Sequence, residues 1–215
     1  MDLFTGIGGF SLALKLFFGE QYRTVCYVEN DGYCQRVIEA RIRDGCLDDA
    51  PIWDDISAFD GRPWAGCVDI ITAGFPCQPW SVAGKRKGEA DERNLWPALY
   101  RVICEVRPGY VLLENVPGLL AKPYFGTILG QLAEGGYDAS WECIPASAIG
   151  ANHQRDRLWI LAYSNSKRLE EFKLQSPNIS FRPSRIQKEK RQMVADSEGG
   201  ESNRRTGRCL EETAT

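Results

Sequence analysis

The chain has 215 residues, of which 43% are hydrophobic and 26% charged, and its net charge is −3. This size and composition are typical of one soluble domain with a full core, and no apolar run approaches the length of a membrane-spanning helix. The eight cysteines form no Cys-x-x-Cys pair and the sequence has one histidine, which favours neither a zinc site nor a disulfide framework. We therefore expect a cytoplasmic protein that binds no metal, because free cysteines are typical of a reducing compartment.

Charge and hydrophobicity divide the chain in two. Residues 1–163 contain 15 Lys and Arg against 21 Asp and Glu, whereas residues 164–215 contain 11 against 8. All six tryptophans lie in the first segment, and the second is too polar to bury much apolar surface. The sequence therefore predicts a folded domain over residues 1–163 and a polar, basic, poorly ordered tail over residues 164–215.

A strand, a glycine-rich turn and a helix open the chain. We predict the strand over residues 1–4, the turn over residues 5–9 and the helix over residues 10–18. Glycines allow a ligand to approach the backbone closely, and the first N–H groups of a helix are free to bind one. Glu29 ends a second predicted strand about 20 residues further on, where an acid binds ribose hydroxyls in dinucleotide-binding folds. Because the pyrophosphate fingerprint Gly-x-Gly-x-x-Gly is absent, we expect a nucleoside without a phosphate chain, with a plain tight turn as the alternative.

The next helix and a short third strand extend this pattern. Asn30 or Asp31 is predicted to cap the helix, and residues 51–53 are predicted to form the strand. Asp55 and Ile56 follow at its carboxyl end. Two consecutive acids before Ile56 are consistent with a solvated turn, but this position also favours contact of Asp55 or Ile56 with a bound adenine.

A cysteine follows the central strand of the predicted sheet. Residues 69–73 are an apolar run that ends in Gly-Phe-Pro, and Cys77 comes next. Ligands of open α/β sheets bind at the carboxyl ends of the strands, and Pro76 and Pro79 restrict the backbone around the thiol. The alternative for Cys77 is a small buried hydrophobic residue. The polar residues 82–93 lack periodicity and contain three consecutive basic residues, which suits a lid that contacts phosphate or a solvated loop.

A carboxylate and two arginines are expected near Cys77. Residues 110–113 form a continuous apolar run, predicted as a strand buried on both faces, and Glu114 follows it directly. In a partly apolar cleft this carboxyl group would hold a proton and donate it; a helix cap is the alternative. Arg155 and Arg157 alternate onto one face at the start of a further strand. They either favour a thiolate and bind a polar ring or are surface charges.

Taken together, these motifs resemble those of the DNA cytosine-5 methyltransferase family, in the same order along residues 1–163. The matching segments are Asp2–Gly9, Glu29, Asp55–Ile56, Gly74–Ser81, Asn94–Leu95, Glu114–Val116 and Arg155–Arg157. One departure is His153, where the family commonly has Gln before the arginines.

The resemblance implies a fold and a set of ligand contacts. The implied fold is α/β, a doubly wound, mostly parallel sheet of the Rossmann-like type found in methyltransferases that use S-adenosylmethionine. The implied contacts to S-adenosylmethionine are Phe4, Gly6, Gly8, Gly9, Glu29, Asp55, Ile56, Asn94 and Leu95. The implied contacts to double-stranded DNA are Gln78, Ser81, Lys85, Arg86 and Asn115.

The resemblance also implies covalent catalysis. Cys77 would add to carbon 6 of cytosine, which makes carbon 5 nucleophilic enough to accept the methyl group. Arg155 or Arg157 would favour the anionic thiol, and Glu114 would bind ring nitrogen 3 and the exocyclic amine. Because the target atom is inaccessible within a duplex, the base must be flipped out, and residues 82–93 would cover it.

The family's target-recognition region and its last two motifs are not recognisable after residue 163. A domain with a net charge of −6 would also repel DNA, since phosphate contacts supply most non-specific affinity. We therefore expect the catalytic half of a methyltransferase, cut short or dependent on a second polypeptide, with the tail as a possible start of the recognition region.

The sequence is consistent with three functions. A prokaryotic or phage DNA methyltransferase of a restriction-modification or protective system is favoured, with an RNA cytosine as a less favoured substrate. A non-catalytic remnant that binds cofactor or a partner is the second. A nucleoside-binding oxidoreductase is the third, and the pairing of Cys77 with Glu114 argues against it.

Overall fold

The computed structural model describes residues 1–76 and 94–165, all of which belong to one compact unit, Met1–Leu174. Its centre is a seven-stranded sheet with the strand order β3-β2-β1-β4-β5-β7-β6. The residues that were predicted to act on cytosine or DNA from the loop after the central strand lie outside the described residues: Cys77, Gln78, Ser81, Lys85 and Arg86. Nearly all of the predicted tail lies outside them as well.

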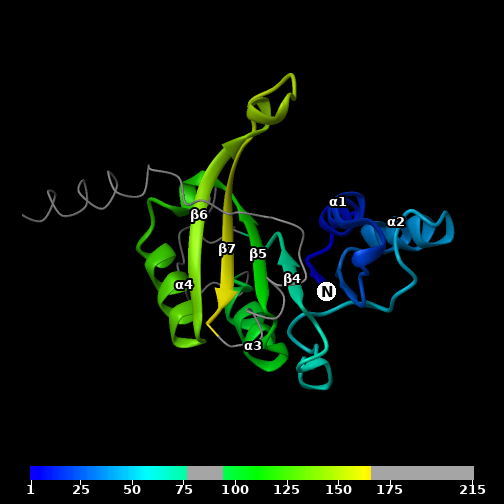
Figure 1. Ribbon diagram of the computed structural model, residues 1–215, viewed down its shortest axis with the longest axis horizontal. Helices are drawn as coiled ribbons and strands as arrows, with labels where there is room; N and C mark the ends of the chain where they lie inside the picture. Colours follow the sequence, from blue (N-terminus) through cyan, green and yellow to red (C-terminus); the bar gives the residue numbers. More distant parts are fainter. Residues whose placement is uncertain (77–93, 166–215) are drawn as a thin grey trace, which may run out of the picture. The chain divides into compact units, whose positions relative to one another are not determined.

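The sheet is mostly parallel, as the sequence predicts. Its strands are β1 (Asp2–Leu3), β2 (Tyr27–Val28), β3 (Ile52–Trp53), β4 (Ile70–Ala73), β5 (Tyr110–Asn115), β6 (Tyr137–Pro145) and β7 (Asp156–Ser164). The strands from β3 to β5 in the sheet order pair in parallel, whereas β7 runs antiparallel to both β5 and β6. Helices on both faces make it doubly wound (Figure 1), which confirms the expected fold class.

The first two helices begin close to where the sequence places them. The helices are α1 (Gly9–Phe18), α2 (Gly32–Arg43), α3 (Trp96–Val106) and α4 (Pro123–Glu134), with short 3-10 segments at Gly19–Gln21, Arg62–Trp64, Pro117–Leu119 and Ala146–Ile149. Asp31, rather than Asn30, caps α2, because its carboxylate accepts hydrogen bonds from the N–H groups of Tyr33 and Cys34. These bonds also lower the pKa of Asp31.

One face of the sheet is covered by α3 and α4. Leu113, Ile160 and Trp141 are adjacent across β5, β7 and β6, so their side chains share this face. Trp141 contacts Phe125 of α4, with ring centroids 5.4 Å apart. The apolar side of α3 is fully buried in the same core. The main hydrophobic core therefore lies between these two helices and the sheet.

The opposite face is covered over only part of its width. Thr72, Leu112 and Leu161 are adjacent across β4, β5 and β7 and share this face. In Figure 1, α1 and α2 lie beside β1 and β2, and none of the described helices lies in front of β5, β7 and β6. Burial therefore alternates along β5. The expectation that residues 110–113 are buried on both faces is wrong, because no described helix covers Leu112 and its neighbours on this face.

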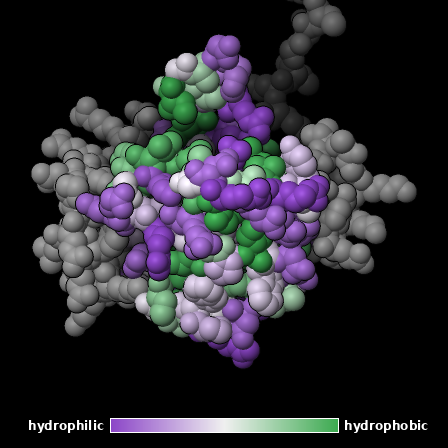
Figure 2. Space-filling model, turned by 90° about the vertical axis from the view of Figure 1, so that its right-hand side faces the viewer, coloured by the Kyte–Doolittle hydropathy of each residue, from purple (hydrophilic) through white to green (hydrophobic). Residues whose placement is uncertain are grey.

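The apolar character of α1 contrasts with its burial. Seven of its ten residues are aliphatic or aromatic, yet Ser11 is its only buried residue. Leu16 is 78% and Phe17 is 73% exposed. Figure 2 views the side of the molecule that carries α1 and α2, and it shows hydrophobic surface among polar side chains. A helix that is apolar nearly all round is usually buried, so this helix presents apolar surface that the described residues do not cover.

Two leucines on different helices test this description of the core. Leu99→Ala in α3 removes a fully buried side chain, and we expect it to lower the free energy of unfolding by about 2–5 kcal/mol. Leu16→Ala in α1 removes an exposed one and should change it by less than about 0.5 kcal/mol. Urea denaturation followed by circular dichroism measures both. Equal losses would mean that the exposed side of α1 is covered in solution.

Candidate cofactor and catalytic site

The candidate site lies at one edge of the sheet. Because β1, β2, β4 and β5 are parallel, the residues that follow them emerge at the same edge: Phe4, Glu29, Gly74 and, within the end of β5, Glu114. The antiparallel β7 starts at this edge and brings Arg157 there. This is the position at which doubly wound sheets bind their ligands.

The glycine turn after β1 borders open space. A Cβ atom built on Gly6 or Gly9 would meet no atom within 4 Å, whereas one on Gly8 would lie 2.6 Å from Leu47 Cδ1. Gly6 and Gly8 have φ angles of 58° and 89°, and Phe4 adopts a φ of 54° although it is not glycine. Such backbone strain is concentrated at functional sites. The turn can therefore bring its backbone against a ligand, as the sequence predicts.

Glu29 is fixed beside this turn by two backbone hydrogen bonds. The N–H of Gly6 donates to Oε2 at 2.6 Å, and the N–H of Asp31 donates to Oε1 at 2.8 Å. Each carboxylate oxygen can accept a further hydrogen bond. The arrangement suits a pair of ribose hydroxyls. The sequence reasoning missed Gln35, whose Nε2 donates to the Glu29 carbonyl at 2.6 Å and ties α2 to the end of β2.

The structure separates the two residues predicted to contact adenine. Asp55 is exposed, and its Oδ1 accepts a hydrogen bond from the N–H of Ser57 at 2.8 Å. Ile56 is buried in the main core, and its carbonyl accepts a hydrogen bond from Arg101. The side chain of Ile56 therefore packs in the core. The Ile56 backbone and Asp55 remain at the surface of the site.

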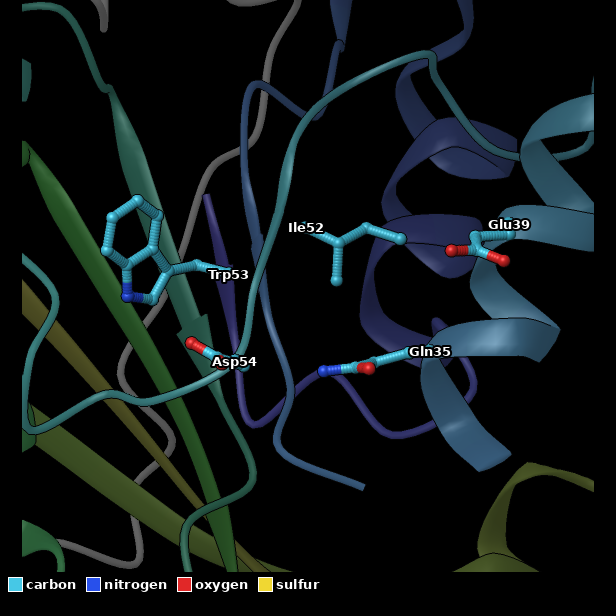
Figure 3. Close-up of a pocket in the computed structure, with 5 residues that line it drawn as sticks. All are labelled: Gln35, Glu39, Ile52, Trp53 and Asp54. Atoms are coloured by element: carbon cyan, nitrogen blue, oxygen red, sulfur yellow. The ribbon is translucent and has the colours of Figure 1, made fainter. Parts of the chain in front are cut away.

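A cavity of about 330 Å³ lies near these residues, at the edge of the sheet. Gln35 and Glu39 project from α2 on one side, together with Ile52, and Trp53 lies on the other side of the strand (Figure 3). Asp54 completes the lining. None of the lining residues is among those predicted to contact the cofactor, although Gln35 donates a hydrogen bond to the Glu29 carbonyl.

Asn94 and Leu95 are held at the start of α3. Asn94 Nδ2 donates to the hydroxyl of Tyr124 at 2.7 Å, and its Oδ1 accepts a hydrogen bond from the N–H of Trp96 at 3.3 Å. Leu95 packs partly against the main core. These contacts join α3 to α4 and fix the predicted cofactor-binding segment in place.

An ion pair forms the polar centre of the second half of the site. Arg157 Nε lies 2.5 Å from Glu114 Oε1, and about a quarter of each side chain is exposed. Arg155 is exposed and has a φ of 98°. The sequence left open which arginine meets the reacting groups, and the structure brings Arg157 to Glu114. A guanidinium group therefore accompanies Glu114, beside the apolar side chains of Phe10 and Trp159.

Gly74 gives access to the other oxygen of this carboxylate. A Cβ atom on Gly74 would lie 3.4 Å from Glu114 Oε2 and 3.8 Å from Phe10 Cε2. Phe10 also meets Trp159 edge to face, with ring centroids 5.8 Å apart. Phe10 thus joins the glycine turn to the Glu114–Arg157 pair. The sequence reasoning missed this role, although the position of Phe10 directly after the turn could have indicated it.

We predicted that Asn115 contacts substrate, but its side chain is hydrogen-bonded to the protein backbone. It is 3% exposed, and its Nδ2 donates to the Phe75 carbonyl at 3.0 Å. Its Oδ1 accepts a hydrogen bond from the N–H of Val116 at 2.8 Å. Asn115 therefore ties the end of β5 to the segment that leaves β4.

Residues 1–76 and 94–165, the part of the chain that the structure describes, contain neither a metal-binding cluster nor a membrane-spanning helix. No cluster of three or more His, Cys, Asp or Glu side chains in this part is arranged to bind a metal ion. No helix in the same part has the length and hydropathy required to cross a membrane.

The sequence is similar to those of characterised methyltransferases. It is 33% identical over 172 residues to the Type II methyltransferase M.CviJI of Paramecium bursaria Chlorella virus IL3A, covering 80% of this chain and 44% of that protein. It is 36% identical over 135 residues to M.NgoMIV of Neisseria gonorrhoeae, covering 60% and 43%. The chain thus spans less than half the length of these two relatives.

Solved structures share the fold. A putative DNA modification methyltransferase encoded within an Escherichia coli prophage superposes with a TM-score of 0.60 at 26% identity, covering 86% of this chain and 50% of that one. A DNMT2 mutant of Spodoptera frugiperda gives a TM-score of 0.64 at 22% identity, covering 78% and 50%.

The family match extends further along the chain than the motifs do. The C-5 cytosine-specific DNA methylase family matches residues 1–212, whereas the motifs identified in the sequence end at residue 163. With the glycine turn, Glu29 and the Glu114–Arg157 pair at one edge of a methyltransferase sheet, the chain belongs to the C-5 cytosine-specific DNA methylase family.

Proposed function

We propose that this chain is the catalytic portion of a DNA cytosine-5 methyltransferase that transfers a methyl group from S-adenosylmethionine to a flipped-out cytosine. The observation that carries the proposal is the Glu114–Arg157 ion pair, which lies at the same sheet edge as the glycine turn and Glu29. A nucleoside site and a site for a polar ring are thereby joined through Phe10. The bacterial and viral origin of the relatives supports a restriction-modification role.

The first half of the site fits S-adenosylmethionine. Glu29 is positioned to accept hydrogen bonds from the ribose hydroxyls, and the open side of Gly6 and Gly9 leaves room for the ligand against the backbone. Asp55 is exposed near the end of β3 and is available to the adenine. When bound, this cofactor supplies an electrophilic methyl group on a sulfonium.

Cys77 provides the nucleophile in this proposal. Its thiolate adds to carbon 6 of cytosine, carbon 5 takes the methyl group, and loss of the carbon 5 proton to a base then expels the thiolate. Covalent catalysis divides one difficult step into two easier ones. Cys77 lies outside the described residues, but Phe75, two residues before it, is held by Asn115.

Glu114 recognises the cytosine ring. Arg157 engages Oε1, so Oε2 remains directed toward Gly74, where the missing Cβ leaves space. The carboxyl group there binds the exocyclic amine and ring nitrogen 3, and stabilises the charge that develops in the ring. Arg157 orients the carboxyl group and contributes the local positive charge.

A second polypeptide that carries the target-recognition region completes the enzyme in this proposal. One feature supports it: one face of β5, β7 and β6 is uncovered by described helices. The apolar and aromatic side chains that β5 and β7 leave at least partly exposed on this face are Tyr110, Leu112, Trp159, Leu161 and Tyr163, and they lie beside Glu114, Arg157 and the polar residues Asp138, Ser140 and Glu142 of β6. With the exposed side of α1 they form a surface suited to apolar packing. The domain boundary at residue 163 and the lid over residues 82–93 are further parts of the proposal.

Trapping on a fluorinated substrate tests the chemistry. We expect the full chain, with S-adenosylmethionine and the recognition polypeptide, to form a covalent adduct with an oligonucleotide that contains 5-fluorocytosine, because fluorine at carbon 5 cannot leave as a proton does. Cys77→Ser should abolish the adduct in intact mass spectrometry. An adduct that persists in Cys77→Ser, or none with any partner, would overturn the proposed mechanism.

The two arginines provide a matched pair for the role of Arg157. Arg157→Lys should slow adduct formation at least about tenfold, because an ammonium does not reproduce the geometry of a guanidinium beside a carboxylate. Arg155→Lys, at an exposed position, should change the rate less than about twofold. Single-turnover trapping with rapid quenching gives both rates. The reverse order of effects would assign the role to Arg155.

The uncovered sheet face can be tested by association. The probe is the C-terminal portion of M.CviJI, coexpressed with this chain, and complex formation is measured by size-exclusion chromatography with light scattering. We expect Leu161→Glu to prevent association by placing a charge on the apolar face. Ile149→Glu, an exposed residue in the segment between β6 and β7, should leave it intact. Absence of a complex, or equal effects of both variants, would contradict this surface.

A further inference from the structure

We propose that Asp2 is a positioning residue that fixes the glycine turn of the cofactor site. The inference rests on the proposed function only for the identity of the ligand. Asp2, Ser11 and Thr72 form a polar cluster in which all three residues are at most 1% exposed. They belong to β1, α1 and β4, the three elements that border the turn. A cluster of this kind needs an explanation, because burying polar groups is costly unless they are hydrogen-bonded.

The carboxylate of Asp2 accepts three hydrogen bonds. Oδ2 accepts from Ser11 Oγ at 2.7 Å and from the Ser11 N–H at 3.3 Å. Oδ1 accepts from Thr72 Oγ1 at 2.7 Å. Burial raises the pKa of Asp2, and these bonds act in the opposite direction. Each oxygen therefore holds a different element, α1 on one side and β4 on the other.

Asp2 replaces the missing cap of α1. The residue at the N-cap position is Gly8, which has a left-handed conformation and no side chain to accept a hydrogen bond. Ser11 is the third residue of α1, and its N–H is one that a capping side chain normally binds. The cap therefore comes from within the sheet, and it fixes the start of the helix relative to β1.

The turn is then held at both ends. Thr5 Oγ1 donates to the Asp2 carbonyl at 2.8 Å, and the Gly8 N–H donates to the Thr5 carbonyl at 3.0 Å. Gly6 lies between these contacts, with its N–H on Glu29. A shift of α1 would move this N–H away from the carboxylate that binds ribose. Thr72 belongs to the strand that leads to Gly74, so one carboxylate ties the cofactor turn to the strand beside Glu114.

Isosteric variants separate positioning from general stability. Thr72→Val removes the hydroxyl that binds Asp2 and keeps the shape, while Thr72→Ser keeps the hydroxyl. Tyr137→Phe is the matched control, because it removes a buried hydroxyl that donates to the Pro108 carbonyl at 2.9 Å, away from the turn. Two quantities are measured on the full chain: hydrogen exchange of the peptide over residues 3–14 without ligand, and the Kd for S-adenosylmethionine by calorimetry.

We expect Thr72→Val to speed exchange of the turn amides about tenfold and to weaken cofactor affinity by a similar factor. Thr72→Ser should keep the wild-type exchange rate and cofactor affinity. Tyr137→Phe should lower the urea midpoint of unfolding without changing the exchange rate or the affinity. If Thr72→Val lowers only the urea midpoint, as the control does, Asp2 is merely structural and the inference is overturned.

The two arms distinguish this inference from the proposed function. If the wild-type chain does not bind S-adenosylmethionine, the assignment of the ligand fails for this chain, and the exchange arm still decides whether Asp2 holds the turn. Faster exchange confined to residues 3–14 in Thr72→Val then supports positioning. Unchanged exchange there overturns it.

Discussion

The parallel alignment of β1, β2, β4 and β5 is the constraint on which the rest of the structure depends. Each parallel strand must return through a crossover, so the residues after these strands emerge together at one edge. Glu29, Gly74 and Glu114 therefore lie along the same edge of the sheet although up to 85 residues separate them in the chain. The antiparallel β7 adds Arg157 at the same edge because its amino end lies where the other strands end.

The candidate site has two halves, and Phe10 connects them. In the proposed function, the glycine turn and Glu29 are the half that binds the nucleoside, and the Glu114–Arg157 pair is the half that binds a polar ring. Phe10 stands between them and packs edge to face on Trp159.

The described helices cover the two faces of the sheet unevenly, and apolar surface stays exposed on the less covered face. The helices α3 and α4 cover one face and form the main core with it. On the other face, described helices lie only beside β1 and β2. Apolar surface on Leu112, Leu161 and α1 remains partly exposed in consequence. In relatives more than twice as long, additional chain is available to cover such a face.

The sequence by itself determined the order of strands and helices and the turn that borders the cofactor site, because hydrophobic periodicity, glycines and caps act over a few residues. It also placed Glu29 and Glu114 at strand ends. Only the tertiary structure decided which arginine meets Glu114, that Ile56 is buried, and that Asn115 holds the Phe75 carbonyl. These outcomes depend on register and on contacts between residues distant in the chain. Burial along residues 110–113 was misjudged for the same reason, since a strand's pattern does not reveal whether a helix covers it.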